Sequence, residues 1–343
     1  MYWNIETPME VIESNVVDID VVVTWLDSSC LKWQKEFKKY KDGSHDGDSS
    51  LPRFRDWDNF HYWFRGIERN MPWIRKVHLV TNGTIPSWLN VEHPKLNLVK
   101  HSDYIRQEYL PTFNSRVIEL NLKNIDGLSE HFILFNDDFF VISPTQPQDF
   151  FFNDLPCDNA IMNAHSGEGI SNVLMNNLTL INSTFNKREV MKKNFFSWFN
   201  IKYRSGLFRN ILLTPWPRFT GFYEPHLPQA YLKSTFNRVW ELHEKELLQT
   251  CRSRFRLASD VNHFLFRYFQ LVENKFHAQS LNWLGCFFQV DDKNYLDVVD
   301  YISSSRGKII AINDGKMNDF ELIRNEINRS LKYKFPDKSR FEI

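Results

Sequence analysis

The sequence contains few of the residues that define several protein classes. Its 343 residues include four cysteines, at positions 30, 157, 251 and 286, and none belongs to a CxxC pair. This pattern argues against a disulfide framework or a zinc site and favours reduced thiols in a cytosol. Lys and Arg number 42, as do Asp and Glu, so the basic excess of a dedicated nucleic-acid-binding protein is missing. We therefore expect no nucleic-acid partner.

Long apolar runs are also missing. The longest runs, around residues 21–23 and 309–312, are far shorter than the roughly 20 residues that cross a bilayer. The first six residues have neither the basic segment nor the apolar core of a secretory signal. We therefore expect a cytoplasmic protein without a transmembrane helix.

Several motifs of common enzyme classes do not occur in the sequence. There is no GxGxxG, GxxxxGK[ST], HExxH or GxSxG pattern, so dinucleotide redox chemistry, P-loop hydrolysis and serine-esterase chemistry lose their main support. The chain is otherwise typical of a globular protein, with 42% hydrophobic and 24% charged residues. Aromatic residues make up 15%, which indicates either a Phe-rich core or exposed rings that stack on a sugar or a base.

The first third of the chain has the pattern of a parallel sheet. Residues 19–25 are β-branched and apolar and predict a buried strand, and residues 77–81 predict a second. Between them, apolar residues at helical spacing follow Asp58, which we expect to cap a helix that Pro72 ends. This order of strand, helix and strand is typical of a βαβ unit.

The rest of the chain contains further predicted helices and strands, some with a clear spacing of apolar residues and some without. We expect a helix that Asn114 or Ser115 caps and that ends near Asn124, then a strand at 132–135, and mixed loops and short helices over 156–225. A helix near 236–247 and an amphipathic helix at 261–272, capped by Ser259 or Asp260, follow. The last elements are a strand at 308–312 and a helix over 320–331, with Asn318 and Glu321 as a capping pair. Together these elements predict an α/β fold with a helical C-terminal part.

Carboxylates follow three of the predicted strands. Asp27 comes after the first strand, Asp137 and Asp138 after the third, and Asp314 after the last. In open α/β sheets, ligands bind beyond the carboxyl ends of the strands. Adjacent acids repel each other unless a cation lies nearby, so the pair at 137–138 indicates a site for a cation such as Mg²⁺ that bridges nucleotide phosphates. The alternative is that these acids form turns or cap helices.

Three other positions have two interpretations each. His226 lies between Pro225 and Pro228, which restrict the backbone and suit a general base, although a packed or capping histidine is the alternative. The run RSRFR at 252–256 places three arginines where they match phosphate oxygens, or form a solvated basic surface. Glu119 interrupts an apolar run and either faces solvent or binds a partner.

Four blocks of the sequence carry a family resemblance. The first is IDVVVTWLD at 19–27, and the second combines PWIRK at 72–76, VTNG at 80–83, PSWLN at 86–90, LPTFNS at 110–115, GLSEHF at 127–132 and NDD at 136–138. The third runs from PHLP at 225–228 to Arg256, and the fourth is IAIND at 310–314. In these blocks the chain resembles the Stealth family, which includes bacterial capsular polysaccharide phosphotransferases and the animal N-acetylglucosamine-1-phosphotransferase.

The resemblance implies roles for individual residues. By position, Asp138 matches the family's metal-binding Asp, with Asp137 adjacent, and Glu119 matches its active-site Glu. His226 matches the proposed catalytic His and Arg256 the Arg that contacts the donor phosphate. We also expect Asp27 and Asn136, together with Arg256, to contact the nucleotide donor.

The resemblance also implies a fold and a division of the chain. The expected sheet is Rossmann-like (GT-A-like), mixed and flanked by helices. Residues 16–155 would form the nucleotide-sugar-binding core, 156–224 an insertion of mixed short elements, and 225–336 a helical region whose late strand completes the active site.

The expected reaction moves a hexose phosphate from a UDP-hexose to a sugar hydroxyl of a growing capsular or cell-surface polysaccharide, with release of UMP. Mg²⁺ or Mn²⁺ would be the cofactor, and His226 would take the proton of the acceptor hydroxyl. The alternatives are a metal-dependent glycosyltransferase that releases UDP and a non-catalytic carbohydrate-binding protein. By analogy with the family, the protein would associate peripherally with an export complex at the inner membrane face.

Overall fold

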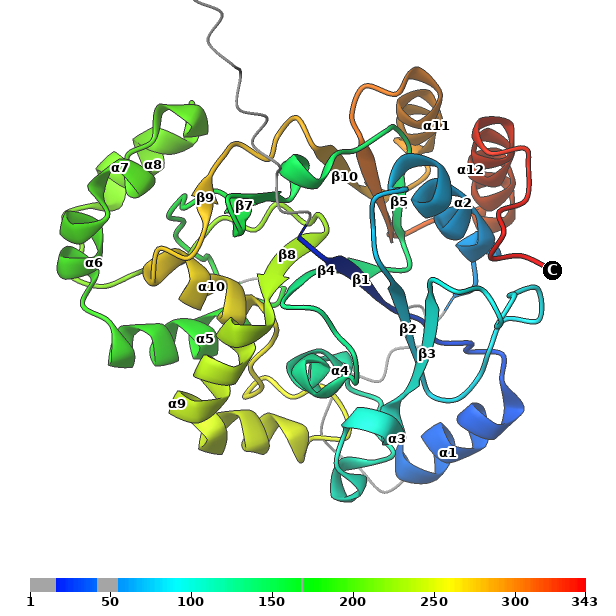
Figure 1. Cartoon of the computed structure of the whole chain (residues 1–343), viewed down its shortest axis with the longest axis horizontal. Coiled ribbons are helices and arrows are strands. Elements are labelled where there is room, and N and C mark those ends of the chain that lie inside the picture. The colour runs from blue at the N-terminus through cyan, green and yellow to red at the C-terminus, as the bar shows by residue number, and fades with distance from the viewer. Residues whose placement is uncertain (1–16, 42–54, 168) are drawn as a thin grey trace, which may run out of the picture.

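The chain folds around a five-stranded sheet with helices on both faces, α9 and α10 toward one side and α2, α11 and α12 toward the other (Figure 1). The computed structural model describes residues 17–41, 55–167 and 169–343. The sheet consists of β3 (Leu96–Lys100), β2 (Val77–Thr81), β1 (Ile19–Thr24), β4 (His131–Asn136) and β8 (Gln229–Leu232), in that order. The first four are parallel and β8 is antiparallel to β4. The predicted α/β class with a mixed, Rossmann-like sheet is confirmed.

The period-2 pattern of the strands divides the core into two halves. In β1, Val22 faces one hydrophobic cluster while Val21 and Val23 face the other, because successive side chains of a strand point to opposite faces. The first cluster is covered by α4 (Ser115–Leu120), α5 (Ser171–Thr184), α9 (Lys233–Cys251) and α10 (Phe264–Val272), and the second by α2 (Phe60–Asn70), α11 (Tyr295–Ser304) and α12 (Phe320–Lys334). Both faces of the sheet are therefore buried.

Two three-stranded sheets extend this core. One has the order β10 (Gly285–Val290), β11 (Ile309–Asp314), β5 (Phe139–Val141), and the other β6 (Phe151–Phe152), β7 (Leu155–Asp158), β9 (His277–Ala278). The predicted late strand is β11, which runs antiparallel to β5 and lies outside the central sheet. The amide of Ile312 donates a hydrogen bond of 2.9 Å to the carbonyl of Asp138, which ties the late strand to the predicted acidic pair.

The remaining helices are short or peripheral. They are α1 (Leu31–Lys41), α3 (His101–Tyr104), α6 (Lys187–Lys193), α7 (Phe195–Trp198), α8 (Gly206–Leu213) and the 3-10 turns Gln107–Tyr109, Leu122–Asn124, Pro147–Asp149 and Ile201–Tyr203. The segment 156–225 contains the predicted short helices, but α5 is longer, at 14 residues. Among the helices of the described ranges, none is long and apolar enough to cross a membrane.

One of the predicted helix caps is confirmed, and the others are wrong. Asn114 caps α4, its side chain accepting a bond from the Arg116 amide. α2 begins at Phe60 after Asn59, whereas Asp58 has a left-handed backbone with a φ of 49°. Asp58 therefore belongs to the turn that precedes the helix and does not occupy the cap position.

The two later caps are wrong because their side chains are engaged elsewhere. His263 precedes α10, while the carboxylate of Asp260 accepts hydrogen bonds from Asn114 at 2.9 Å and Arg116 at 3.0 Å. Asp319 caps α12 by accepting a bond from the Leu322 amide. Its neighbour Asn318 is instead bound to Asp292, and Glu321 pairs with Arg324.

Candidate active site

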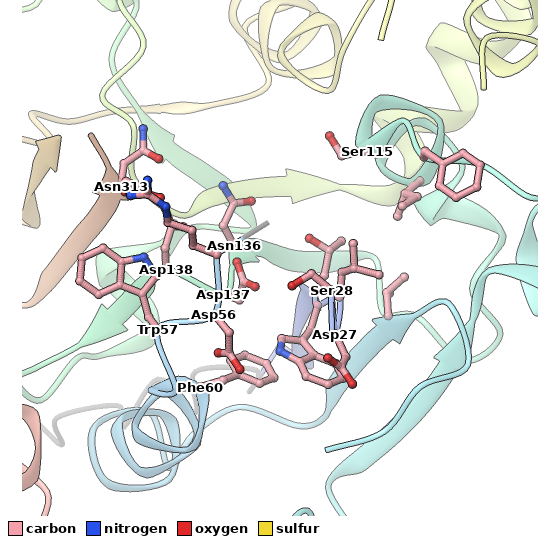
Figure 2. Close-up of a pocket in the computed structure, with 18 of the residues that line it drawn as sticks. Asp27, Ser28, Asp56, Trp57, Phe60, Ser115, Asn136, Asp137, Asp138 and Asn313 are labelled. Carbon is pink, nitrogen blue, oxygen red and sulfur yellow. The ribbon is translucent and has the colours of Figure 1, made fainter. Parts of the chain in front are cut away.

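A cavity of about 480 Å³ lies where β1 and β4 end, within the volume range of small-ligand sites (Figure 2). Its walls come from the residues after β1, from α4, from the turn after β4 and from the end of β11. The sequence-predicted residues that line it are Asp27, Glu119, Asn136, Asp137, Asp138, Arg256 and Asp314. The carboxyl ends of two parallel strands thus bring together residues that are far apart in the sequence.

The acidic pair occupies the turn between β4 and β5. Burial raises the pKa of Asp137 to about 6, and burial together with the charge of Asp137 raises that of Asp138 to about 8. The Oδ1 atom of Asp138 and the Oδ2 atom of Asp314 are buried without a hydrogen-bond partner. Figure 2 shows Asp56 and Asp27 on the same cavity. The site therefore gathers acidic side chains around a buried carboxyl group, Asp138, whose ionisation is unfavourable without a cation.

These oxygens suit a hard divalent cation. Repelling, desolvated carboxylates raise each other's pKa, and a bound cation would favour the ionised form of both. Within the described ranges, no three His, Cys, Asp or Glu side chains are placed to hold one ion. Mg²⁺ fits such a partial set, because it is usually bound through one or two carboxylates while substrate phosphates and water supply the other ligands.

Asp27 forms the predicted turn and also lines the cavity. The amide and hydroxyl of Ser29 donate to its Oδ1 atom at 2.9 and 2.6 Å, which forms the turn after β1. The same residue lines the cavity beside Ser28 (Figure 2). The turn holds the carboxyl end of β1 in a fixed shape at the cavity wall.

Glu119 is committed to a partner. The first residue of α4 is Ser115, so Glu119 lies one turn later on the same helix face. The Glu119 side chain is 14% exposed, and its Oε2 atom lies 4.0 Å from Nε2 of His263. The other ring nitrogen of His263 is hydrogen-bonded to the hydroxyl of Tyr231 at 2.8 Å. Sequence reasoning missed His263, which falls inside the predicted helix at 261–272 and which the structure places just ahead of α10.

The arginine run divides between two roles. Arg256 lines the cavity and donates a bond of 2.6 Å from Nη2 to the Ser115 hydroxyl. Arg254 instead donates to the carbonyl of Pro111 at 2.7 Å and lies over the ring of Tyr40. The phosphate-binding interpretation therefore suits Arg256, while Arg254 holds the loop.

His226 does not line the cavity. Its backbone is left-handed, with a φ of 52°, and its ring packs against Phe287 of β10 at a centroid distance of 4.5 Å. Partial burial, with a smaller contribution from His263, lowers the pKa of the imidazole below its usual value. His226 retains solvent access. Non-glycine residues with such a backbone cluster at functional sites.

Aromatic rings form much of the remaining wall. Trp25, Trp33, Trp57, Phe60 and Phe113 line the cavity, and the rings of Trp25 and Phe60 are stacked at 5.7 Å. Sequence reasoning could not assign individual rings to a ligand. The fold brings these five into the cavity wall, where an exposed ring would suit the face of a sugar or a base.

The sequence is similar to that of known polysaccharide phosphotransferases over nearly its whole length. The family model described as Stealth protein CR2, conserved region 2, matches residues 53–157. The capsular polysaccharide phosphotransferase WcwK of Streptococcus pneumoniae is 39% identical, over 96% of this chain and 99% of that protein. The exopolysaccharide phosphotransferase cps2G of Lactiplantibacillus plantarum is 38% identical, over 96% and 97%. Among solved structures, the WbbM bifunctional glycosyltransferase matches with a TM-score of 0.41 and 10% identity, over 92% of this chain and 50% of that one, which is too distant to bear on function.

Proposed function

This chain belongs to the Stealth family, and we propose that it transfers hexose 1-phosphate from a UDP-hexose, or a UDP-N-acetylhexosamine, to a polysaccharide hydroxyl with release of UMP. The protein is a transferase, the class to which its named relatives belong. The acceptor would be a growing capsular or cell-surface polysaccharide. The observation that carries the proposal is the buried, unpartnered Oδ1 atom of Asp138 in the same cavity as Arg256.

The two sides of the cavity suit a nucleotide diphosphate. Asp138 and Asp137 would hold Mg²⁺ or Mn²⁺, which when bound neutralises charge on the phosphate oxygens. Arg256 would contact the phosphate that carries the sugar, because a guanidinium matches phosphate oxygens at two points. Asp27 and Asn136, at the ends of β1 and β4, would contact the rest of the donor.

The acceptor would approach from the side of His226. Its lowered pKa keeps the imidazole neutral at neutral pH, as a general base requires. His226 would take the proton of the acceptor hydroxyl while that oxygen forms a bond to the sugar-bearing phosphorus. The bond from this phosphorus to the bridging oxygen breaks, and UMP leaves with that oxygen. The bond between the sugar and its phosphate stays intact, so the anomeric configuration is retained.

Glu119 and His263 would orient this region. Their 4.0 Å contact joins α4 to the start of α10, and Tyr231 fixes the other nitrogen of His263. We assign His263 a positioning role, because its ring lies between Glu119 and the hydroxyl of Tyr231. Glu119, which lines the cavity, would contact the acceptor or the donor sugar.

The products of the reaction test the proposal. The purified protein is incubated with UDP-sugars, Mg²⁺ and capsule oligomers, and both products are identified by mass. UMP and an acceptor that has gained a hexose phosphate support phosphotransfer. Release of UDP with an acceptor that has gained only a hexose would establish a glycosyltransferase instead. Sugar binding without nucleotide turnover, with or without Mg²⁺, would establish a carbohydrate-binding protein.

A further inference from the structure

The helices α6, α7 and α8 lie at one edge of the molecule, far from α11 and α12 (Figure 1). We call residues 187–218 the edge segment. Its exposed large apolar side chains are Phe195, Phe196, Ile201, Phe208, Ile211, Leu212 and Trp216. Two of these, Phe196 and Ile201, are each 84% exposed, which is unusual for side chains of this size.

The same segment concentrates positive charge. It contains eight Lys and Arg residues and one acid, Glu189, a net charge of eight minus one, +7, in a chain whose overall charge is zero. The exposed cations are Arg188, Lys192, Lys193, Lys202, Arg204, Arg209 and Arg218. Cations and large apolar side chains are therefore exposed together along this one segment.

This exposure is fixed by the fold beneath it. The buried Lys187 donates from Nζ to the carbonyls of Leu213 at 2.5 Å and Trp216 at 2.9 Å, which holds the end of α8. Buried Asn210 donates to the carbonyls of Ala160 and Trp198 at 2.7 and 2.6 Å. The bonds of these two buried side chains therefore fix the position of α8, which carries the exposed Phe208, Ile211 and Leu212.

We propose that the edge segment docks on an anionic lipid bilayer. Apolar side chains interleaved with Lys and Arg are typical of segments that lie in the membrane interface, where the rings enter the headgroup region and the cations meet anionic lipids. Cations near such a surface are attracted by its negative potential. The seven exposed cations select an anionic partner, and the exposed apolar side chains select one that accepts them into its interior. This inference does not depend on the proposed reaction.

Vesicle binding tests the proposal. The full chain is sedimented with vesicles of phosphatidylcholine alone or mixed with phosphatidylglycerol. We expect binding to the anionic vesicles and little to the neutral ones. Lys192→Glu with Lys193→Glu, and separately Phe196→Ser with Phe208→Ser, should each weaken binding at least tenfold.

Matched variants elsewhere on the surface separate docking from general effects. Lys38→Glu with Lys39→Glu on α1 makes the same charge change, and Tyr333→Ser on α12 removes a ring that is 87% exposed. Both should bind vesicles as the parent does, and all variants should keep its melting temperature. Equal binding to both vesicle types, or unchanged binding by the Phe variant, would overturn the proposal. Light scattering shows whether the chain forms a dimer. A dimer that is lost in Phe196→Ser with Phe208→Ser would overturn the proposal and show that a second copy of the chain covers this segment.

Discussion

The Nη2 atom of Arg256 donates a hydrogen bond of 2.6 Å to the hydroxyl of Ser115, the first residue of α4. The bond joins the segment ahead of α10 to the helix that carries Glu119. It aims the guanidinium at the cavity that holds the acidic turn. The position of this arginine therefore depends on a partner that is 141 residues away in the sequence.

Replacing this arginine should weaken transfer more than replacing its partner. Arg256→Lys keeps the charge but loses the two-point fork, so we expect kcat/KM for the nucleotide sugar to fall roughly 10²-fold. Ser115→Ala removes only the orienting bond and should cost a few-fold at most. Steady-state release of UMP measures both. Wild-type kcat/KM in Arg256→Lys would argue against phosphate contact.

His226→Asn should lower turnover about 10²-fold or more, because the general base is lost. Asn is the matched replacement, since it tolerates the left-handed backbone of this position. Because burial lowers the pKa of His226, activity in the parent should fall only as the pH drops below about 6.5. This acid limb should disappear in the variant. His277→Asn, on β9, serves as the control, and near-normal turnover of His226→Asn would refute the assignment.

Glu119 and His263 should act as one unit. We expect Glu119→Gln and His263→Asn each to lower kcat, and the double variant to be less impaired than the product of the two effects. The reason is their contact of 4.0 Å, which either change removes. A double-mutant cycle on kcat, with melting temperatures recorded alongside, measures the coupling. Strict additivity would show that the two residues act independently.

Asp138→Asn should stabilise the metal-free protein and impair metal binding. Burial and the neighbouring Asp137 raise the pKa of Asp138 to about 8, so its ionised form is unfavourable without a cation. A neutral side chain removes that repulsion, and we expect the melting temperature without metal to rise by a few degrees. Calorimetric titration with Mg²⁺ and UDP should show at least tenfold weaker binding. EDTA should abolish turnover of the parent, and Mg²⁺ or Mn²⁺ should restore it.

Asp20→Asn should destabilise the fold by about 3 kcal/mol, because a buried charge pair loses one partner. Asp20 is fully buried on β1 and accepts bonds from Arg75 and His78. Burial opposes its ionisation, but bonds from His78, Arg75 and Ser129 prevail and lower its pKa. The contribution to stability is thus present above the unfolded pKa, about 3.9, and is lost as the pH falls through the folded value. Urea unfolding at several pH values measures this.

Asp18→Asn is the matched control for Asp20. Its carboxylate lies 3.9 Å from the same Arg75 but is 69% exposed. Exposed pairs contribute little, so this variant should unfold like the parent. Equal losses in the two variants would show that the burial of Asp20 is unimportant.

Much of the sheet could be predicted because its strands follow simple rules. The runs that form β1, β2 and β4 are short and apolar, because both faces of these strands are buried. The sequence therefore predicts all three with nearly correct ends. Their carboxyl ends then placed Asp27 and Asp138 in one cavity. β3 was missed because only one of its five residues is fully buried, which leaves a weak apolar pattern.

The rest of the site depends on contacts that no local pattern encodes. The pairing of Glu119 with His263 arises only when α4 packs near the start of α10. His226 was found from its flanking prolines, but its place beside Phe287, outside the cavity wall, requires β10 to lie next to it. Spacing along a chain predicts faces of helices and strands, and it does not predict which loops meet.

The hydrogen bond from Ile312 to the carbonyl of Asp138 has a consequence for biosynthesis. A ribosome releases the acidic turn long before the strand that pairs with β5. Nascent chains that stop short of β11 should therefore fail to retain the donor, and competence for nucleotide binding should arise only near the end of translation.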